Sequence, residues 1–136
     1  MKQEYKSLLI ALLAILLVNA IGSLASRQFN FNYLYVGPVS FLVYFALGYA
    51  VTQRTNLLKG TLMTGVLGLF DATAGWKVSM VLNANVGNLN NHPSSRQWIT
   101  TVIAVTLYGL IVGLIGGGIA KGLTKKRRSV QSTNLP

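Results

Sequence analysis

The sequence predicts an all-α integral membrane protein, a bundle of four transmembrane helices with both termini in the cytoplasm. Of its 136 residues, 51% are apolar and only 10% are charged, which is too little charge for the surface of a soluble domain. A helix needs roughly 20 apolar residues to cross a bilayer, and three uncharged stretches reach that length: 7–26, 28–53 and 97–120. A fourth stretch, 60–70, is long enough only if Asp71 also lies within the membrane.

The first span is expected at about residues 7–26. Its basic start, its leucine-rich stretch and the sequence Ser23-Leu24-Ala25 are also typical of a cleaved signal peptide. The apolar stretch is longer than most signal-peptide cores, and another hydrophobic segment follows it, so a retained helix is favoured. Cleavage would leave three spans, with the same orientation for the rest of the chain.

The other three spans are expected at about residues 33–52, 57–82 and 98–120. Gly37-Pro38 lies close to the start of the second span, where the missing N–H donor and fixed φ of proline disturb a helix least. The third span is long, and Asp71 and Lys77 interrupt its apolar sequence.

Polar segments follow the third and fourth spans. Residues 83–97 hold five asparagines, a proline and two serines without an apolar period, which indicates a loop on the outer side. The transmembrane domain is therefore expected to cover residues 1–124. The basic segment 125–136 is predicted to be a disordered cytoplasmic tail.

The distribution of basic residues predicts the orientation. If the four spans alternate, nine lysines and arginines fall on the side of both termini, and only Arg27, Lys77 and Arg96 fall on the other. Cytoplasmic loops are enriched in Lys and Arg, so both termini are expected in the cytoplasm, at a cell membrane. The side chains expected to contact lipid headgroups, anionic ones at the cytoplasmic face, are Lys77, Arg96, Lys125, Lys126, Arg127 and Arg128.

Glycines recur with helical spacing in the last two spans. They are Gly60, Gly68 and Gly75 in the third span and Gly109, Gly113 and Gly117 in the fourth. Such spacing puts small residues on one helix face and lets two helix backbones approach closely. It predicts tight helix packing, either within the chain or with another copy or another membrane protein.

Asp71 lies on the small-residue face of the third span. At about 1.5 Å per residue, it is roughly 21 Å from the cytoplasmic surface, and Asn19, Ser40 and Thr101 reach about the same depth on the other spans. The amide and both hydroxyls can donate hydrogen bonds to a carboxylate. The sequence thus predicts an intramembrane polar site in which Asp71 is either a hydrogen-bonded hub or a proton or cation site.

Enzymatic chemistry is not expected. Glu4 and Asp71 are the only acidic residues, and they lie near opposite faces of the membrane, too far apart for paired acid and base catalysis. With no cysteine and one histidine, His92, the chain offers too few ligands for a metal site. No cofactor motif is present, and nucleic-acid binding is not expected because the basic residues fit the positive-inside pattern.

Two functional hypotheses follow. The favoured one is a non-enzymatic membrane subunit or scaffold that acts through helix packing and self-associates. The alternative is an oligomeric pathway, a transporter or channel for an ion or a small solute, that uses Asp71. They differ in whether water reaches Asp71.

Overall fold

The computed structural model describes residues 2–87 and 94–133, with side chains described as far as Lys125. Within these ranges the chain is helical apart from short connections, with no strand. The helices are, in order, α1 (Gln3–Gln28), the 3-10 helix η1 (Tyr33–Val36), α2 (Gly37–Arg54), α3 (Leu57–Phe70), the π-helix η2 (Asp71–Gly75), α4 (Trp76–Val81) and α5 (Ser95–Thr133). His92 and the side chains of Lys126, Arg127 and Arg128 lie outside the described part.

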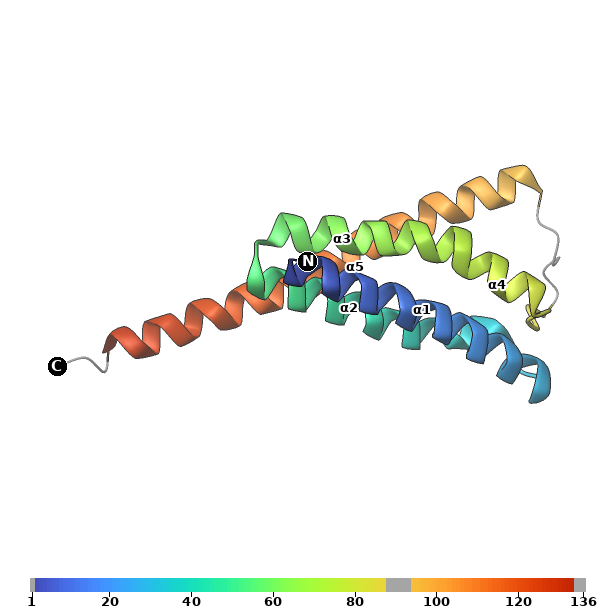
Figure 1. The fold of residues 1–136 in the computed structure, drawn as a ribbon, viewed down its shortest axis with the longest axis horizontal. Helices are drawn as coiled ribbons and strands as arrows, with labels where there is room; N and C mark the ends of the chain where they lie inside the picture. Colours follow the sequence, from blue (N-terminus) through green and yellow to red (C-terminus); the bar gives the residue numbers. More distant parts are fainter. Residues whose placement is uncertain (1, 88–93, 134–136) are drawn as a thin grey trace.

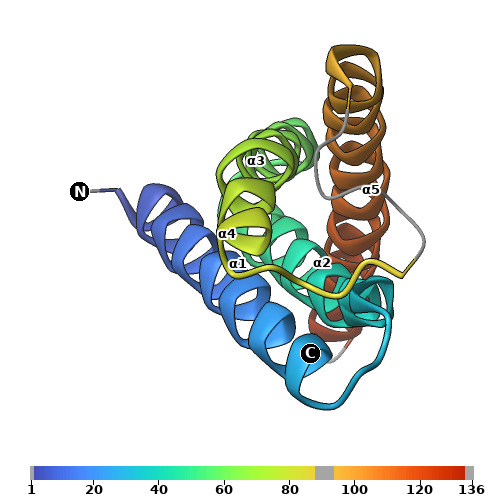
Figure 2. The ribbon, with the colours of Figure 1, turned by 90° about the vertical axis from the view of Figure 1, so that its right-hand side faces the viewer.

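The helices form one elongated bundle (Figure 1). α1 and α2 lie side by side, α3, η2 and α4 follow one another along them, and α5 packs against α2 and α3. Seen from one end, α5 lies on the far side of the bundle from α1 (Figure 2). We call the end that holds residues 29–32 and 82–87 the loop end of the bundle.

Three helical segments are long and apolar enough to cross a membrane: Gln3–Gln28, Tyr33–Arg54 and Ser95–Lys125. Large apolar side chains cover the outside of the bundle, and Leu17 and Ile21, for example, are each more than half exposed. Such a surface is unfavourable in water and suits contact with lipid chains. The buried core is correspondingly narrow, and its larger members are Ile15, Tyr44, Leu47, Val51, Leu67 and Val112.

The segment expected as the third span is helical from Leu57 to Val81 without a break. Asn56 caps its start, because the side-chain oxygen accepts a hydrogen bond from the backbone N–H of Lys59 at 2.9 Å. One π-helical turn, Asp71–Gly75, divides it into α3 and α4. The sequence analysis did not predict this turn.

α5 begins at Ser95, earlier than the expected residue 98. Ser94 and Gln97 explain the early start, since they form a capping box. The backbone N–H of Gln97 donates to Ser94 Oγ at 3.3 Å, and the backbone N–H of Ser94 donates to Gln97 Oε1 at 2.9 Å. The loop expected at residues 83–97 therefore ends at Ser94, because residues 95–97 belong to α5.

α5 also continues to Thr133, whereas the sequence analysis predicted a disordered tail over residues 125–136. No glycine or proline falls between residues 123 and 133, and the Lys, Arg and Gln residues there favour a helix. The last turns of α5 therefore extend beyond the bundle as a helix (Figure 1). α1 likewise extends beyond the expected 7–26 at both ends.

Glycines allow the backbones of α2, α3 and α5 to meet. A Cβ atom added at Gly48 would lie 2.8 Å from the Cα of Gly113, and one at Gly109 would lie 2.6 Å from the carbonyl oxygen of Thr64. A Cβ at Gly68 would lie 2.8 Å from the carbonyl oxygen of Val105. Real Cβ atoms do not approach other atoms so closely, so these contacts require glycine.

The glycine contacts continue toward the other end of the bundle. A Cβ at Gly60 would lie 2.9 Å from the carbonyl oxygen of Gly48, and one at Gly117 would lie 2.7 Å from Leu57 Cδ1. By contrast, a Cβ at Gly118 or Gly122 would meet nothing within 4 Å. The closely packed glycines therefore contact helices of the same chain; they are Gly48, Gly60, Gly68, Gly109, Gly113 and Gly117.

Candidate functional site

Asp71 lies at the start of the π-helical turn η2, about midway along the helical run Leu57–Val81. A π turn widens the helix and leaves carbonyl groups without their usual partners. The hydroxyl of Thr73 donates to the carbonyl oxygen of Leu69 at 2.8 Å and to that of Phe70 at 3.2 Å. It thus provides a hydrogen bond to the carbonyl groups just before the π turn. Gly75 completes the turn on the side of α1.

Gly75 lets α1 approach the carboxylate. A Cβ at this position would lie 2.6 Å from Asn19 Nδ2 and would also collide with Asp71 Oδ1. Any other residue would therefore push Asn19 and Asp71 apart. The sequence analysis assigned Gly75 to the helix-packing face, and the structure places it against the polar site.

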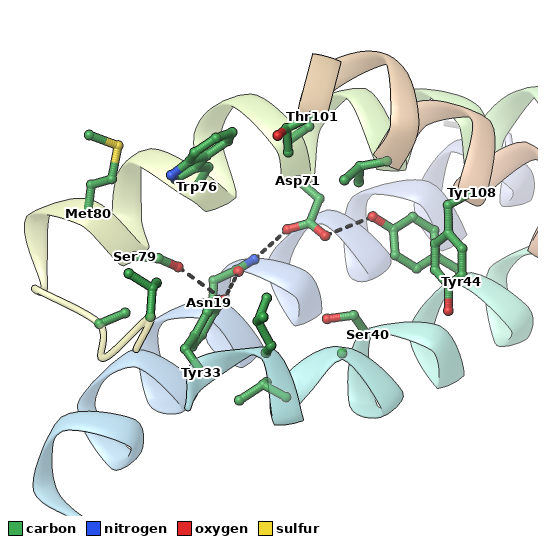
Figure 3. A pocket seen from close by; sticks show the side chains of 17 residues that line it. Asn19, Tyr33, Ser40, Tyr44, Asp71, Trp76, Ser79, Met80, Thr101 and Tyr108 are labelled. Carbon is green, nitrogen blue, oxygen red and sulfur yellow. Dashed lines mark hydrogen bonds between the residues drawn. The ribbon is translucent and has the colours of Figure 1, made fainter. Parts of the chain in front are cut away.

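Two neutral donors bind the carboxylate of Asp71, one to each oxygen (Figure 3). Asn19 Nδ2 donates to Oδ1 at 2.6 Å, and the hydroxyl of Tyr44 donates to Oδ2 at 2.8 Å. The donors come from α1 and α2, so the acid joins these helices to η2. Each oxygen can accept a further hydrogen bond, since a carboxylate offers about four lone-pair directions.

The polar network extends from Asn19 toward the loop end. The hydroxyl of Tyr33 donates to Asn19 Oδ1, and Ser79 Oγ donates to the hydroxyl of Tyr33 at 3.0 Å. Asn19 Nδ2 also donates to the carbonyl oxygen of Ile15 at 2.8 Å. Asn19 is thus bonded through both ends of its amide, which holds its nitrogen toward Asp71.

A cavity of about 410 Å³ lies beside this network. Asp71, Asn19, Ser40 and Thr101, the four residues of the expected polar layer, all line it. Asn19 alone among the other three bonds to Asp71, whereas the hydroxyl of Thr101 donates to the carbonyl oxygen of Gln97 at 3.0 Å. The structure therefore brings the four together around one space rather than in one hydrogen-bonded cluster.

Four aromatic rings contribute to the cavity wall. Tyr33, Tyr44, Trp76 and Tyr108 line it, and the rings of Tyr44 and Tyr108 meet edge to face with their centroids 5.9 Å apart. Figure 3 shows the carboxylate of Asp71 between Asn19 on one side and Tyr44 on the other. Asp71 itself is only half-buried, so its carboxylate is part of the cavity surface.

Sequence reasoning missed Tyr44, Tyr33 and Ser79. Tyr44 lies one helical turn from Ser40 on the same face of α2, which is the signal that could have identified it. Tyr33 was expected only as the start of the second span, although its hydroxyl points inward to Asn19 and Ser79.

No cation of the described residues pairs with Asp71. The ion pair found among the described residues joins Lys59 Nζ to Glu4 Oε1 at 4.0 Å. It lies near the end of the bundle opposite the loop end. Lys77, Arg96 and Lys125, which were expected at lipid headgroups, are exposed. Within the described ranges, no three His, Cys, Asp or Glu residues cluster as metal ligands would.

The site therefore consists of one hydrogen-bonded carboxylate on the wall of a cavity lined by aliphatic side chains, hydroxyls and four aromatic rings. Such an arrangement can hold a proton or a positively charged group, because the neutral donors leave the charge of the carboxylate uncompensated. The chain matches no model of a known protein family, no curated protein and no solved structure.

Proposed function

We propose that this protein is a four-span membrane protein that binds a small solute at Asp71, as part of a transport or channel pathway. The observation that carries the proposal is the half-buried Asp71 on the wall of a cavity of about 410 Å³. In this account the helical run Leu57–Val81 also crosses the membrane, as the third of four spans, and α1 is a retained helix because its Asn19 completes the site.

The proposed orientation follows from the charges. With both termini in the cytoplasm, the loop end faces outward and the cavity lies in the outer half of the membrane. Lys121, Lys125 and the basic residues that follow then face anionic headgroups of the cytoplasmic leaflet. The proposed activity is non-enzymatic, since Asp71 has no second acid near it for general acid and base catalysis.

The cost of a buried carboxylate supports binding over a purely structural role. An acid inside a membrane is expensive unless water, a proton or a cation compensates it. Hydrogen bonds from Asn19 and Tyr44 reduce this cost without neutralising the charge. A cavity that admits water or solute would supply the remaining stabilisation.

A second candidate function is a helix-packing subunit or scaffold that self-associates. It is favoured by the bonds of Asn19, Tyr33 and Ser79, which join three helical elements and would fix their register without any ligand. Residues 94–100 of the α5 end are all exposed and could contact another copy or another membrane protein.

Cysteine labelling separates the two functions, because the chain has no native cysteine. Asp71→Cys in proteoliposomes should react with a small water-soluble thiol reagent nearly as fast as the exposed Ser95→Cys. Thr64→Cys is the matched control, since Thr64 is fully buried among the packed helices. If Asp71→Cys reacts as slowly as Thr64→Cys, the site is dry, and the solute-binding proposal fails in favour of the packing subunit.

A further inference from the structure

We infer that the ligand of this cavity is an organic monocation with an apolar body, held by Asp71 and the surrounding aromatic rings. The inference rests on the proposed function, since it names the class of solute that the same site would bind. Three properties of the cavity support it: its charge, the aromatic rings in its wall, and its volume.

The charge of the cavity calls for a single positive group. Among the described residues that line it, Asp71 is the one acid, and none is Lys, Arg or His. Both carboxylate oxygens already accept a bond from a neutral donor and retain free lone pairs. A monocation would therefore neutralise the site, whereas an anion would face an uncompensated negative charge.

The wall favours an organic cation over a metal ion. Tyr33, Tyr44, Trp76 and Tyr108 line the space, and aromatic faces attract ammonium-type cations, most strongly where water is excluded. Hard metal ions instead require about six or more oxygen ligands for Ca²⁺ and an octahedral set for Mg²⁺. The lining offers one carboxylate, the amide of Asn19 and six hydroxyls, of which those of Tyr33, Tyr44, Ser79 and Thr101 already donate hydrogen bonds within the chain. A single carboxylate would also leave either divalent ion with a net positive charge.

The volume suits a ligand with an apolar body. The cavity of about 410 Å³ falls within the range of roughly 300–1,000 Å³ found for sites of drug-sized molecules, and a bare inorganic ion would leave most of it empty. Ser40 lines the cavity, and its hydroxyl has no hydrogen-bond partner within the described part of the chain. That hydroxyl is available to a polar substituent of the ligand.

A fluorescence titration tests the inference. The chain has two tryptophans, so Trp98→Phe leaves Trp76, in the cavity wall, as the single tryptophan, which is excited at a wavelength that tyrosine does not absorb. This protein in lipid nanodiscs is titrated with tetraphenylphosphonium and, separately, with tetraphenylborate, which matches it in shape and has the opposite charge. Empty nanodiscs provide the correction for partition into lipid.

The expected result is a saturable change of Trp76 emission with the phosphonium and none with the borate. Asp71→Asn should weaken phosphonium binding by about tenfold or more, because it removes the charge at close range. Glu4→Gln is the matched control, since it removes the other acid outside the cavity, and it should leave binding unchanged. Equal binding of the two ions, or unchanged binding in Asp71→Asn, would overturn the inference.

Two further variants keep the test decisive if Asp71→Asn does not fold. Asp71→Glu retains the charge and should retain binding, whereas Ser40→Leu fills part of the cavity without touching the hydrogen bonds of Asp71 and should abolish it. Full binding in Ser40→Leu contradicts the assigned site. If Asp71→Cys is labelled rapidly but the phosphonium does not bind, the cation inference fails while the solute-binding function stands.

Discussion

Membrane depth, estimated by counting residues along each span, predicted one of the two partners of Asp71. Counting residues placed Asn19 at the level of Asp71, and the structure joins them by a hydrogen bond of 2.6 Å. The same count selected Ser40 and overlooked Tyr44, the residue on α2 that bonds to the acid. Residue counting gives the depth of each Cα, which is close to the depth of the polar atom in a short side chain. In a tyrosine the hydroxyl lies far from the Cα and therefore at a different depth.

The bond from Tyr44 to Asp71 gives a first prediction. Tyr44→Phe removes the hydroxyl and leaves one oxygen of the half-buried carboxylate without its donor, so it should lower the free energy of unfolding by about 1–2 kcal/mol. The measurement is unfolding of the purified protein in mixed micelles, followed by circular dichroism.

The matched control for Tyr44→Phe is Tyr35→Phe, because Tyr35 is 75% exposed. This variant should unfold like the native protein. Equal stability of both variants would mean that the Tyr44 hydroxyl does not stabilise Asp71.

At the scale of the helix, the extent of the helical run Leu57–Val81 was predictable and its internal turn was not. The expected range 57–82 agrees closely with the helical run Leu57–Val81, because hydrophobic length and the polar segment after it limit a span. The π turn Asp71–Gly75 depends instead on contacts with Asn19 and Tyr44, far away in the sequence. Local propensity contains no information about such partners.

Glycine packing between helices gives a second prediction. A Cβ at Gly113 would lie 2.8 Å from Thr64 Cβ and 3.2 Å from Thr61 Cα, so Gly113→Ala forces α3 and α5 apart. We expect a loss of about 1–3 kcal/mol in the free energy of unfolding, as for other overpacked cores.

Gly118 provides the control for this prediction on the same helix. A Cβ at Gly118 would meet nothing within 4 Å, so Gly118→Ala should be neutral or stabilise the helix by up to about 1 kcal/mol. A larger loss at Gly118 than at Gly113 in the same unfolding assay would contradict the packing of α5 described above.

At the scale of the whole molecule, the apolar composition predicts a membrane environment, and the distribution of basic residues predicts the orientation of the helices in the membrane. Three helices with spanning length and an apolar outer surface agree with the membrane expected from 51% apolar residues. The helical end of α5 did not follow from the same reasoning, because a polar, basic segment was taken to be disordered although its residues favour a helix.

The orientation gives a third prediction. In intact bacterial cells that express the protein, Ser95→Cys should react with a membrane-impermeant maleimide, because the loop end faces outward in the proposed topology. Thr124→Cys, at the end of the bundle opposite the loop end, should react only after the cells are permeabilised. The opposite pattern would invert the topology and place the cavity in the cytoplasmic half of the membrane.

The central claim is that the carboxylate of Asp71 faces a wet cavity, and one spectrum of the native protein can test it. Asp71 is the sole aspartate of the chain, so cell-free synthesis with ¹³C-carboxyl aspartate yields a single labelled side-chain carboxyl group. Water-edited solid-state NMR in lipid bilayers then measures how fast magnetisation passes from water to that carbon. The account predicts rapid transfer; transfer as slow as that to the fully buried side chains of Ile15 and Leu67, measured in a second, uniformly ¹³C-labelled sample, would contradict it.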